Sequence, residues 1–152
     1  MGAGSASAQI QFLEARMKRG GGSSVPRLRP VSYKIPEGHA SRIRKMEQQY
    51  PDLFEYVEGK QTPTSLRKME QADLITDEVG IGEYAETMGV SIDKIISAYI
   101  DILKPGGVLL MSTINGLDWS DIPRNKLKLI EEQQFLTSRS NSNFIMITKR
   151  KD

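Results

Sequence analysis

The sequence predicts an α/β fold in which a mostly parallel sheet carries helices on both faces and ends in a C-terminal antiparallel hairpin. Short apolar runs alternate with segments whose apolar residues recur at helical spacing. The run Val108-Leu109-Leu110-Met111 is apolar without alternation, as in a strand covered on both faces. Near the C-terminus, two strand-like runs flank the polar segment Ser140-Asn141-Ser142-Asn143, which predicts a hairpin turn.

The first part of the chain is predicted to hold two helices and two strands. Ile10, Leu13 and Met17 recur at helical spacing, and the glycines that follow them end this helix. Aromatic and β-branched residues around Phe54 indicate a strand. The predicted elements are a helix over 5–19, a flexible loop over 20–30 leading into a strand over 28–35, a helix over 40–49 and a strand over 53–57.

The second part holds the clearest helix of the sequence, which begins after Ser91. Its apolar stripe consists of Ile92, Ile95, Ile96, Tyr99, Ile102 and Leu103. The turn Lys104-Pro105-Gly106-Gly107 is predicted to end it. The predicted elements are a short helix from Thr62 to about Gln71, a strand over 73–77, this helix over 91–103, a strand over 108–111, a helix over 125–133 and hairpin strands over 135–139 and 144–148.

Length and composition narrow the class of protein. A chain of 152 residues suits a single domain over 1–152. It has no Cys and one His, so disulfides, thiolate metal sites, thiol catalysis and His-rich metal sites are excluded, and we expect no metal. No apolar stretch approaches the roughly 20 residues that a bilayer requires, and no secretion signal opens the chain. We therefore expect a cytoplasmic protein that does not interact with membranes.

The charge is unevenly distributed. Residues 1–50 contain nine Lys and Arg against three acids, whereas 51–152 contain twelve against sixteen. A basic first third would suit a nucleic-acid partner. Few aromatic residues interleave with these cations, so solvated helix faces are the preferred interpretation and RNA binding is the weakest of the functional hypotheses.

Acidic side chains follow three of the predicted strands. Glu37, Glu58 and Asp77 lie where those strands end, and ligands of open parallel sheets bind beyond the carboxyl ends of the strands. Carboxylates there can accept hydrogen bonds from ribose hydroxyls or from an exocyclic amine. In addition, Gly2 and Gly4 precede the first helix, where backbone N–H groups can approach a carboxylate or a phosphate.

Together these residues resemble the class I S-adenosylmethionine-dependent methyltransferases. The specific part of the resemblance covers residues 72–114: a strand ending in acids, an amphipathic helix, the turn Leu103-Lys104-Pro105-Gly106-Gly107 and an apolar strand, in the family's order. The resemblance implies a Rossmann-like sheet and S-adenosyl-L-methionine as cofactor. It also implies a domain that starts at the glycine-rich motif, N-terminally truncated so that the family's first strand is missing.

The resemblance implies a role for each candidate residue. Gly2 and Gly4 would face the methionine moiety of the cofactor, and Glu37 would bind its ribose. Glu58 and Gly59 would lie near the adenine. The residues implied beside the sulfonium and the methyl acceptor are Asp77, Glu78 and Val79. No catalytic residue is assigned, although Asp77 or Glu78 would serve as the base if the acceptor must lose a proton.

The function predicted is methyl transfer to an unidentified acceptor, either a small molecule or a macromolecule. The alternative is a non-catalytic or truncated methyltransferase-like module that acts as a binding or interaction domain. A nicotinamide dehydrogenase is disfavoured because the full Gly-x-Gly-x-x-Gly pattern after a strand is absent. The oligomeric state stays open, since two copies of a chain without a central strand could pair.

Overall fold

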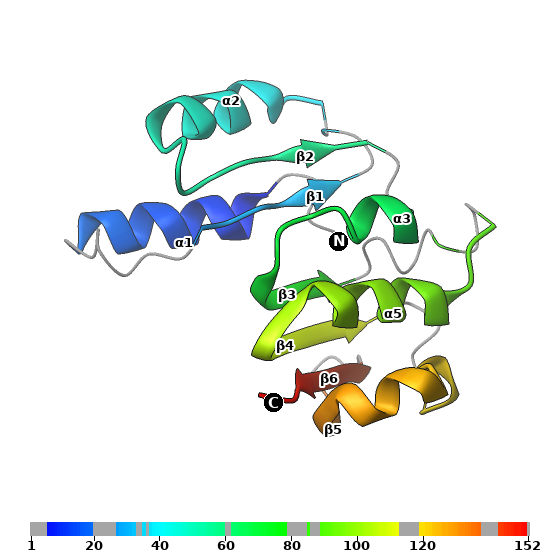
Figure 1. Cartoon of the computed structure of the whole chain (residues 1–152). Helices are drawn as coiled ribbons and strands as arrows, with labels where there is room; N and C mark the ends of the chain where they lie inside the picture. Colours follow the sequence, from blue (N-terminus) through cyan, green and yellow to red (C-terminus); the bar gives the residue numbers. More distant parts are fainter. Residues whose placement is uncertain are drawn as a thin grey trace. The chain divides into compact units, whose positions relative to one another are not determined.

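The computed structural model describes residues 6–19, 27–32, 35, 37–59, 62–78, 85, 89–112, 119–137 and 143–151. The chain consists of two compact units, which we call the N-terminal unit (Gly2–Lys60) and the C-terminal unit (Gln61–Asp152) (Figure 1). Each unit has its own hydrophobic cluster. The single domain expected over 1–152 stays a prediction.

The N-terminal unit combines two helices with a short parallel strand pair. Its elements are α1 (Ser7–Lys18), β1 (Val31–Ser32), α2 (Ala40–Gln49) and β2 (Val57–Glu58). Both predicted helices are confirmed, because apolar residues at helical spacing bury one face of each. The hydrophobic cluster of this unit includes the buried residues Ala6, Ile10, Leu13, Ile43, Met46 and Phe54.

The two predicted strands of this unit are shorter than expected. Val31 pairs with Val57 and Ser32 with Glu58, and an isolated bridge joins Leu28 to Phe54. Between these pairs Pro30 accepts a hydrogen bond from the Val57 N–H (2.9 Å) but has no N–H to donate, so the ladder is interrupted. Of the predicted loop, residues 20–26 lie outside the described residues.

The C-terminal unit is built on a four-stranded mixed sheet. Its elements are α3 (Pro63–Leu66), β3 (Ala72–Glu78), α5 (Ile92–Ile102), β4 (Leu103–Ser112), the 3₁₀ helices η4 (Trp119–Asp121) and η5 (Arg124–Leu129), β5 (Ile130–Thr137) and β6 (Asn143–Lys149). The strand order is β3-β4-β6-β5. β3 and β4 are parallel, whereas β4 with β6 and β5 with β6 are antiparallel. The sheet is therefore mixed rather than mostly parallel, because β6 inserts between β4 and β5.

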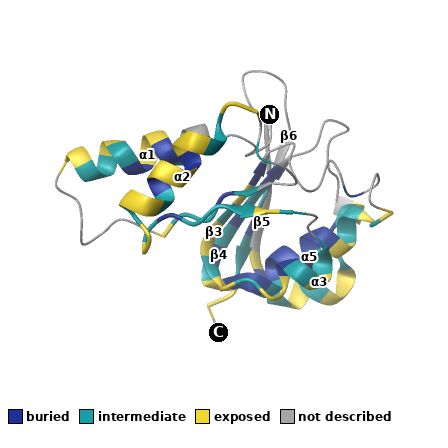
Figure 2. Cartoon of the chain, turned by 90° about the horizontal axis from the view of Figure 1, so that it is seen from above, coloured by how far each residue is buried: buried dark blue, intermediate teal, exposed yellow. Residues whose placement is uncertain are grey.

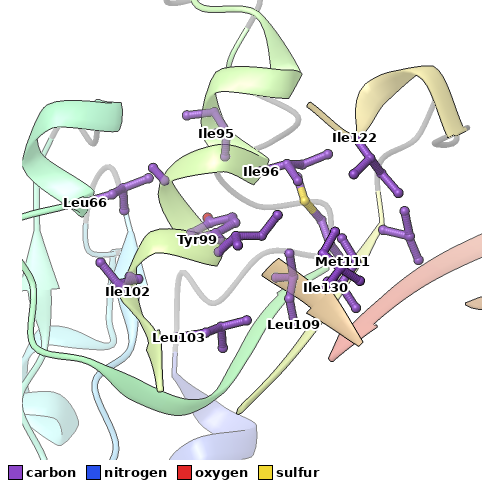
Figure 3. Packing of buried hydrophobic residues seen from close by; sticks show 14 of the residues in the cluster. Leu66, Ile95, Ile96, Tyr99, Ile102, Leu103, Leu109, Met111, Ile122 and Ile130 are labelled. Atoms are coloured by element: carbon purple, nitrogen blue, oxygen red, sulfur yellow. The ribbon is translucent and has the colours of Figure 1, made fainter. Parts of the chain in front are cut away.

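The core of this unit lies between α5 and one side of the sheet. The sheet contributes Leu109 and Met111 from β4 and their partners Ile147 and Ile145 from β6. Figure 2 shows the buried stripe of α5, and Figure 3 shows its side chains packed against β4. The buried residues of α5 are Ile95, Ile96, Ala98, Tyr99, Ile100 and Ile102. The opposite side of the sheet is less buried: Val108 and Leu110 are half-buried and Leu74 is 61% exposed.

Two predicted helices of this unit are wrong in extent. The helix expected from Thr62 to Gln71 ends at Leu66, although the predicted Thr62 cap is present. The helix expected over 125–133 is a 3₁₀ helix that ends at Leu129, after which β5 begins. The apolar spacing of Leu127 and Ile130 suits a helix, but pairing of β5 with β6 over its whole length overrides it. The two predicted hairpin strands are confirmed as an antiparallel pair, the first starting earlier than expected, whereas residues 140–142 of the predicted turn lie outside the described residues.

The turn that follows α5 is part of β4. Ala72 pairs with Leu103 and Leu74 with Val108, so β4 advances five residues while β3 advances two. The extra residues, Lys104 to Gly107, form an irregularity in the strand rather than a separate loop. α5 ends at Ile102, within one residue of the predicted end.

Candidate functional site

A buried carboxylate lies at the end of β3. Asp77 is 5% exposed and is the next-to-last residue of this parallel strand. Its register partner is Met111 of β4, a buried residue on the side of the sheet that packs against α5. Because the side chains of a strand alternate between its faces, Asp77 lies on the same side as Ile75, and Leu74 and Thr76 lie on the other side. Asp77 is therefore an acid within a mainly apolar layer.

The hydroxyl of Tyr99 on α5 donates a hydrogen bond to Asp77 Oδ2 at 2.9 Å. Tyr99 is itself 4% exposed. Burial, the charge of Asp77 and this hydrogen bond all raise the pKa of Tyr99 well above 10.0. The phenol therefore keeps its proton and acts as a constant hydrogen-bond donor to the carboxylate.

In the N-terminal unit, the other predicted acids lie at one edge of the β1–β2 pair. Glu58 is the last residue of β2, and its Oε1 accepts a hydrogen bond from the Ile35 N–H at 2.9 Å. Glu37 follows in the turn before α2 and is exposed. The hydrogen bond thus ties the segment that leads to Glu37 to the end of β2. Gly59 comes next with φ of +131°, a conformation that L side chains rarely adopt.

The remaining predicted site residues are described only in part. Glu78 ends β3 in register with Ser112, and its backbone alone is described. Gly2, Gly4 and Val79 lie outside the described residues. The structure brings Glu58 together with the segment before Glu37 in the N-terminal unit, and it places Asp77 and Glu78 at the end of β3 in the C-terminal unit. The cofactor assignment of all these residues stays a prediction.

Sequence reasoning missed the partner of Asp77. Tyr99 was predicted to be part of an apolar stripe, and its ring does pack there (Figure 3). A signal was present, since a Tyr in a stripe that is otherwise aliphatic carries a hydroxyl that needs a buried partner. The strand that ends in acids precedes this helix along the chain and offers carboxylates as possible partners.

Two other kinds of feature are absent from the described part of the chain. Among those residues, no group of three or more His, Asp or Glu is arranged to hold a metal ion. Within the same ranges, no helix is both long and apolar enough to cross a membrane.

Comparison with known proteins gives one sequence relative and several structures of similar fold. No protein-family model matches the chain. An uncharacterized protein of Archaeoglobus fulgidus is 31% identical over 84 residues, which make up 55% of this chain and 92% of that protein.

Among solved structures, a precorrin-6y C5,15-methyltransferase from Geobacter metallireducens is 19% identical with a TM-score of 0.51, covering 99% of this chain and 77% of that one. A possible exported protein from Bordetella parapertussis is 15% identical with a TM-score of 0.50, covering 82% of this chain. The chain spans about half (53%) of the length of the Bordetella protein. At these identities the likeness concerns the fold, which is methyltransferase-like.

Proposed function

We propose that this chain, which belongs to the same family as an uncharacterized protein of Archaeoglobus fulgidus, is an S-adenosylmethionine-dependent methyltransferase domain. One of its structural neighbours is a precorrin-6y C5,15-methyltransferase, and the fold of the chain is methyltransferase-like. The observation that carries the proposal is the buried carboxylate Asp77 at the carboxyl end of β3, where open α/β sheets bind ligands. A Rossmann-like arrangement with helices on both faces and a cytoplasmic location belong to the same proposal.

The chemistry of the candidate residues fits this cofactor. S-adenosylmethionine bears ribose hydroxyls, an exocyclic amine, an ammonium group and a positive sulfonium. Each of these groups is either a hydrogen-bond donor or a cation, and ionised carboxylates accept hydrogen bonds and attract cations. Glu37, Glu58 and Asp77 are all carboxylates at strand ends or in the turn that follows one. An anionic ligand such as a dinucleotide would instead be repelled by these carboxylates, because they carry charge of the same sign.

The residues of the chain would bind and orient the cofactor and would form no covalent bond with it. S-adenosylmethionine, when bound, supplies a methyl group on a sulfonium for in-line displacement, which depends on alignment and exclusion of water. Asp77, fixed by Tyr99, would offer a negative charge of defined orientation at the end of β3. Glu58, fixed against the Ile35 N–H, would accept a hydrogen bond from the nucleoside. Gly2 and Gly4 would approach the methionine moiety through their backbone.

The acceptor is left open as a small molecule or a macromolecule. Methyl transfer requires a base only when the acceptor must lose a proton. Asp77 or Glu78 would take that proton. Tyr99 would not, because its raised pKa keeps it protonated.

Calorimetric titration of the full chain with S-adenosylmethionine and S-adenosylhomocysteine tests the proposal. We expect binding in the micromolar range, about −8 kcal/mol. Asp77→Ala and Glu58→Ala should each weaken the binding at least about tenfold, which corresponds to about 1.4 kcal/mol. Circular dichroism should show that both variants retain the fold. Asp77→Asn, which keeps a hydrogen-bond acceptor for Tyr99, separates loss of charge from loss of the contact.

Each variant has a matched control in the chain. Asp73 lies on the same strand as Asp77, but its side chain is 81% exposed and pairs with Lys104, so Asp73→Ala should bind like the wild type. Glu47 of α2 accepts a hydrogen bond from the Tyr56 N–H at 3.0 Å, just before β2 begins, whereas Glu58 lies at the carboxyl end of β2. Glu47→Ala therefore controls for the loss of a contact between a carboxylate and a backbone N–H. A well-folded wild type that binds neither ligand would refute the proposal. Binding without methyl transfer to any acceptor would favour the binding-module alternative.

A further inference from the structure

The hydroxyl of Tyr99 is a polar group in an aliphatic layer. The buried neighbours of Tyr99 on its own helix are Ile or Ala, and the facing strand β4 contributes Leu109 and Met111 (Figure 3). A buried hydroxyl without a partner costs free energy, as does a buried carboxylate. The hydrogen bond of 2.9 Å between Tyr99 and Asp77 satisfies both groups at once.

The bond also joins two elements that are far apart in the sequence. Tyr99 and Asp77 are 22 residues apart, one on α5 and the other near the end of β3. α5 is a helix with a full buried face, so the position of the Tyr99 ring is fixed by packing. A rigid ring that donates to one carboxylate oxygen restricts the rotamer of that carboxylate.

We propose that Tyr99 is a positioning residue: its hydroxyl holds the Asp77 carboxylate ionised and in one orientation at the carboxyl end of β3, where a ligand would bind. The inference rests on the proposed function, because that function supplies the reason for a fixed charge at this edge. Tyr99 acts through Asp77 and is not assigned a contact with the cofactor. A hydrogen bond donated to the ionised form stabilises that form over the protonated one. Since the pKa of Tyr99 is raised, the donor persists over the whole range in which a carboxyl group titrates.

Other charged residues lie on the described elements that pack beside Asp77. Along β3 the acids are Asp73, which pairs with Lys104 of β4, and Glu78. β4 faces Asp77 with Met111, which carries no charge. The charged residues of α5 are Asp93, Lys94 and Asp101. Asp101 pairs with Arg67, which directly follows α3, and with Lys126 of η5. Tyr99 differs from these groups in being uncharged, and its hydroxyl donates a hydrogen bond to Asp77.

The test compares the wild type with Tyr99→Phe, which removes the hydroxyl and keeps the ring. Tyr50→Phe is the matched control, because Tyr50 also takes part in a side-chain hydrogen bond, accepting from Gln49 Nε2 at 2.9 Å, but at an exposed site of the N-terminal unit. The first measurement is a carboxyl ¹³C NMR titration of the ligand-free full chain, with the Asp77 signal assigned from Asp77→Asn. The second is calorimetric titration with S-adenosylhomocysteine between pH 4 and pH 8.

In Tyr99→Phe we expect the Asp77 carboxyl to take up its proton about one pH unit higher than in the wild type, a change of about tenfold in proton affinity. The acid limb of the S-adenosylhomocysteine binding curve should move in the same direction by a similar amount. Tyr50→Phe should change neither. A purely structural role for Tyr99 would lower stability and leave both pH profiles in place, which would overturn the inference.

The two measurements separate the inference from the function on which it rests. If the wild type binds S-adenosylhomocysteine and Tyr99→Phe matches Tyr50→Phe in both profiles, the inference is wrong and the proposed function stands. If the wild type binds nothing at any pH, the proposed function falls, and the ligand-directed role of Tyr99 falls with it. An unchanged Asp77 titration in Tyr99→Phe refutes the positioning role regardless of any ligand.

Discussion

The substitution Gly107→Ala is predicted to destabilise the C-terminal unit more than any other change in the turn after α5. A Cβ at this position would lie 2.9 Å from the carbonyl oxygen of Lys104, 3.0 Å from that of Ala72 and 3.2 Å from that of Asp73. All three neighbours are backbone atoms, so no side chain can rotate away. The close approach exists because the extra residues of β4 fold against the start of β3.

The magnitude follows from these contacts. Forcing an extra methyl group into a closely packed position costs about 1–3 kcal/mol. Because three backbone oxygens crowd the new methyl, we expect Gly107→Ala to lie at the upper end, about 3 kcal/mol of unfolding free energy. The assay is urea unfolding followed by the fluorescence of Trp119, the single Trp of the chain, which lies in the C-terminal unit. The midpoint should fall while the slope with urea stays unchanged.

Gly106→Ala is the control one residue away. Gly106 has φ of +77°, but a Cβ there would meet only side-chain carbons of Lys151, the nearest at 3.4 Å. Its cost is the strain of a left-handed residue, about 1 kcal/mol. Gly107→Ala should therefore be the more harmful of the two although its φ lies outside the left-handed range. Equal or reversed effects would show that the backbone oxygens move aside easily, and the reasoning would be refuted.

Three further changes test other parts of the chain. Thr62→Ala removes the capping box of α3 and should cost about 1 kcal/mol in urea unfolding. Burial alone would raise the pKa of Asp101, but hydrogen bonds and charges from Lys126 and Arg67 hold this pKa below 3.8. The stability that the ionised Asp101 adds is therefore present above about pH 4. It is lost as the pH falls through the lowered pKa of the folded state. Asp101→Asn should accordingly cost about 1 kcal/mol at pH 7 and less at pH 3. Leu13→Ala opens a cavity in the N-terminal unit and should lower the free energy of unfolding by about 3 kcal/mol. If the chain unfolds as a single cooperative domain, the urea transition followed by Trp119 fluorescence should shift as well. A shift seen by circular dichroism but not by fluorescence would mean that the two units unfold separately.

The three longest described helices, α1, α2 and α5, could be predicted from the sequence because their apolar residues recur over several turns. α2 was predicted without error, and α5 within one residue at each end, since isoleucines recur along one face of α5 over its whole length. β1 and η5 could not be predicted in extent. Short segments depend on their partners: β1 loses its ladder at Pro30, which only accepts, and η5 gives way to the strand pairing of β5 with β6.

The acidic residues of the candidate site could be predicted from the sequence, but their hydrogen-bond partners could not. Strand ends followed by carboxylates can be read from the order of residues, which is why Glu58 and Asp77 were singled out. The contacts that fix them come from elsewhere: the Ile35 N–H for Glu58 and the Tyr99 hydroxyl for Asp77. The sequence indicates that the hydroxyl of Tyr99 needs a buried partner, but its local patterns do not identify which residue is the partner. The glycine turn is a similar case, because the resemblance pointed to it and the three carbonyl oxygens around Gly107 give the physical reason.

The direction from which a ligand can reach Asp77 follows from the sides of β3. Side chains at 74 and 76 are exposed, and Asp77, one residue further, is buried on the side that α5 covers. A ligand lying across the Leu74 side would therefore meet the back of the strand and not the carboxylate. Access to Asp77 along the α5 side is filled by Tyr99, Leu109 and Met111. Asp77 lies next to the carboxyl end of β3, and this end is where ligands of open α/β sheets bind, so the proposed function places the ligand there.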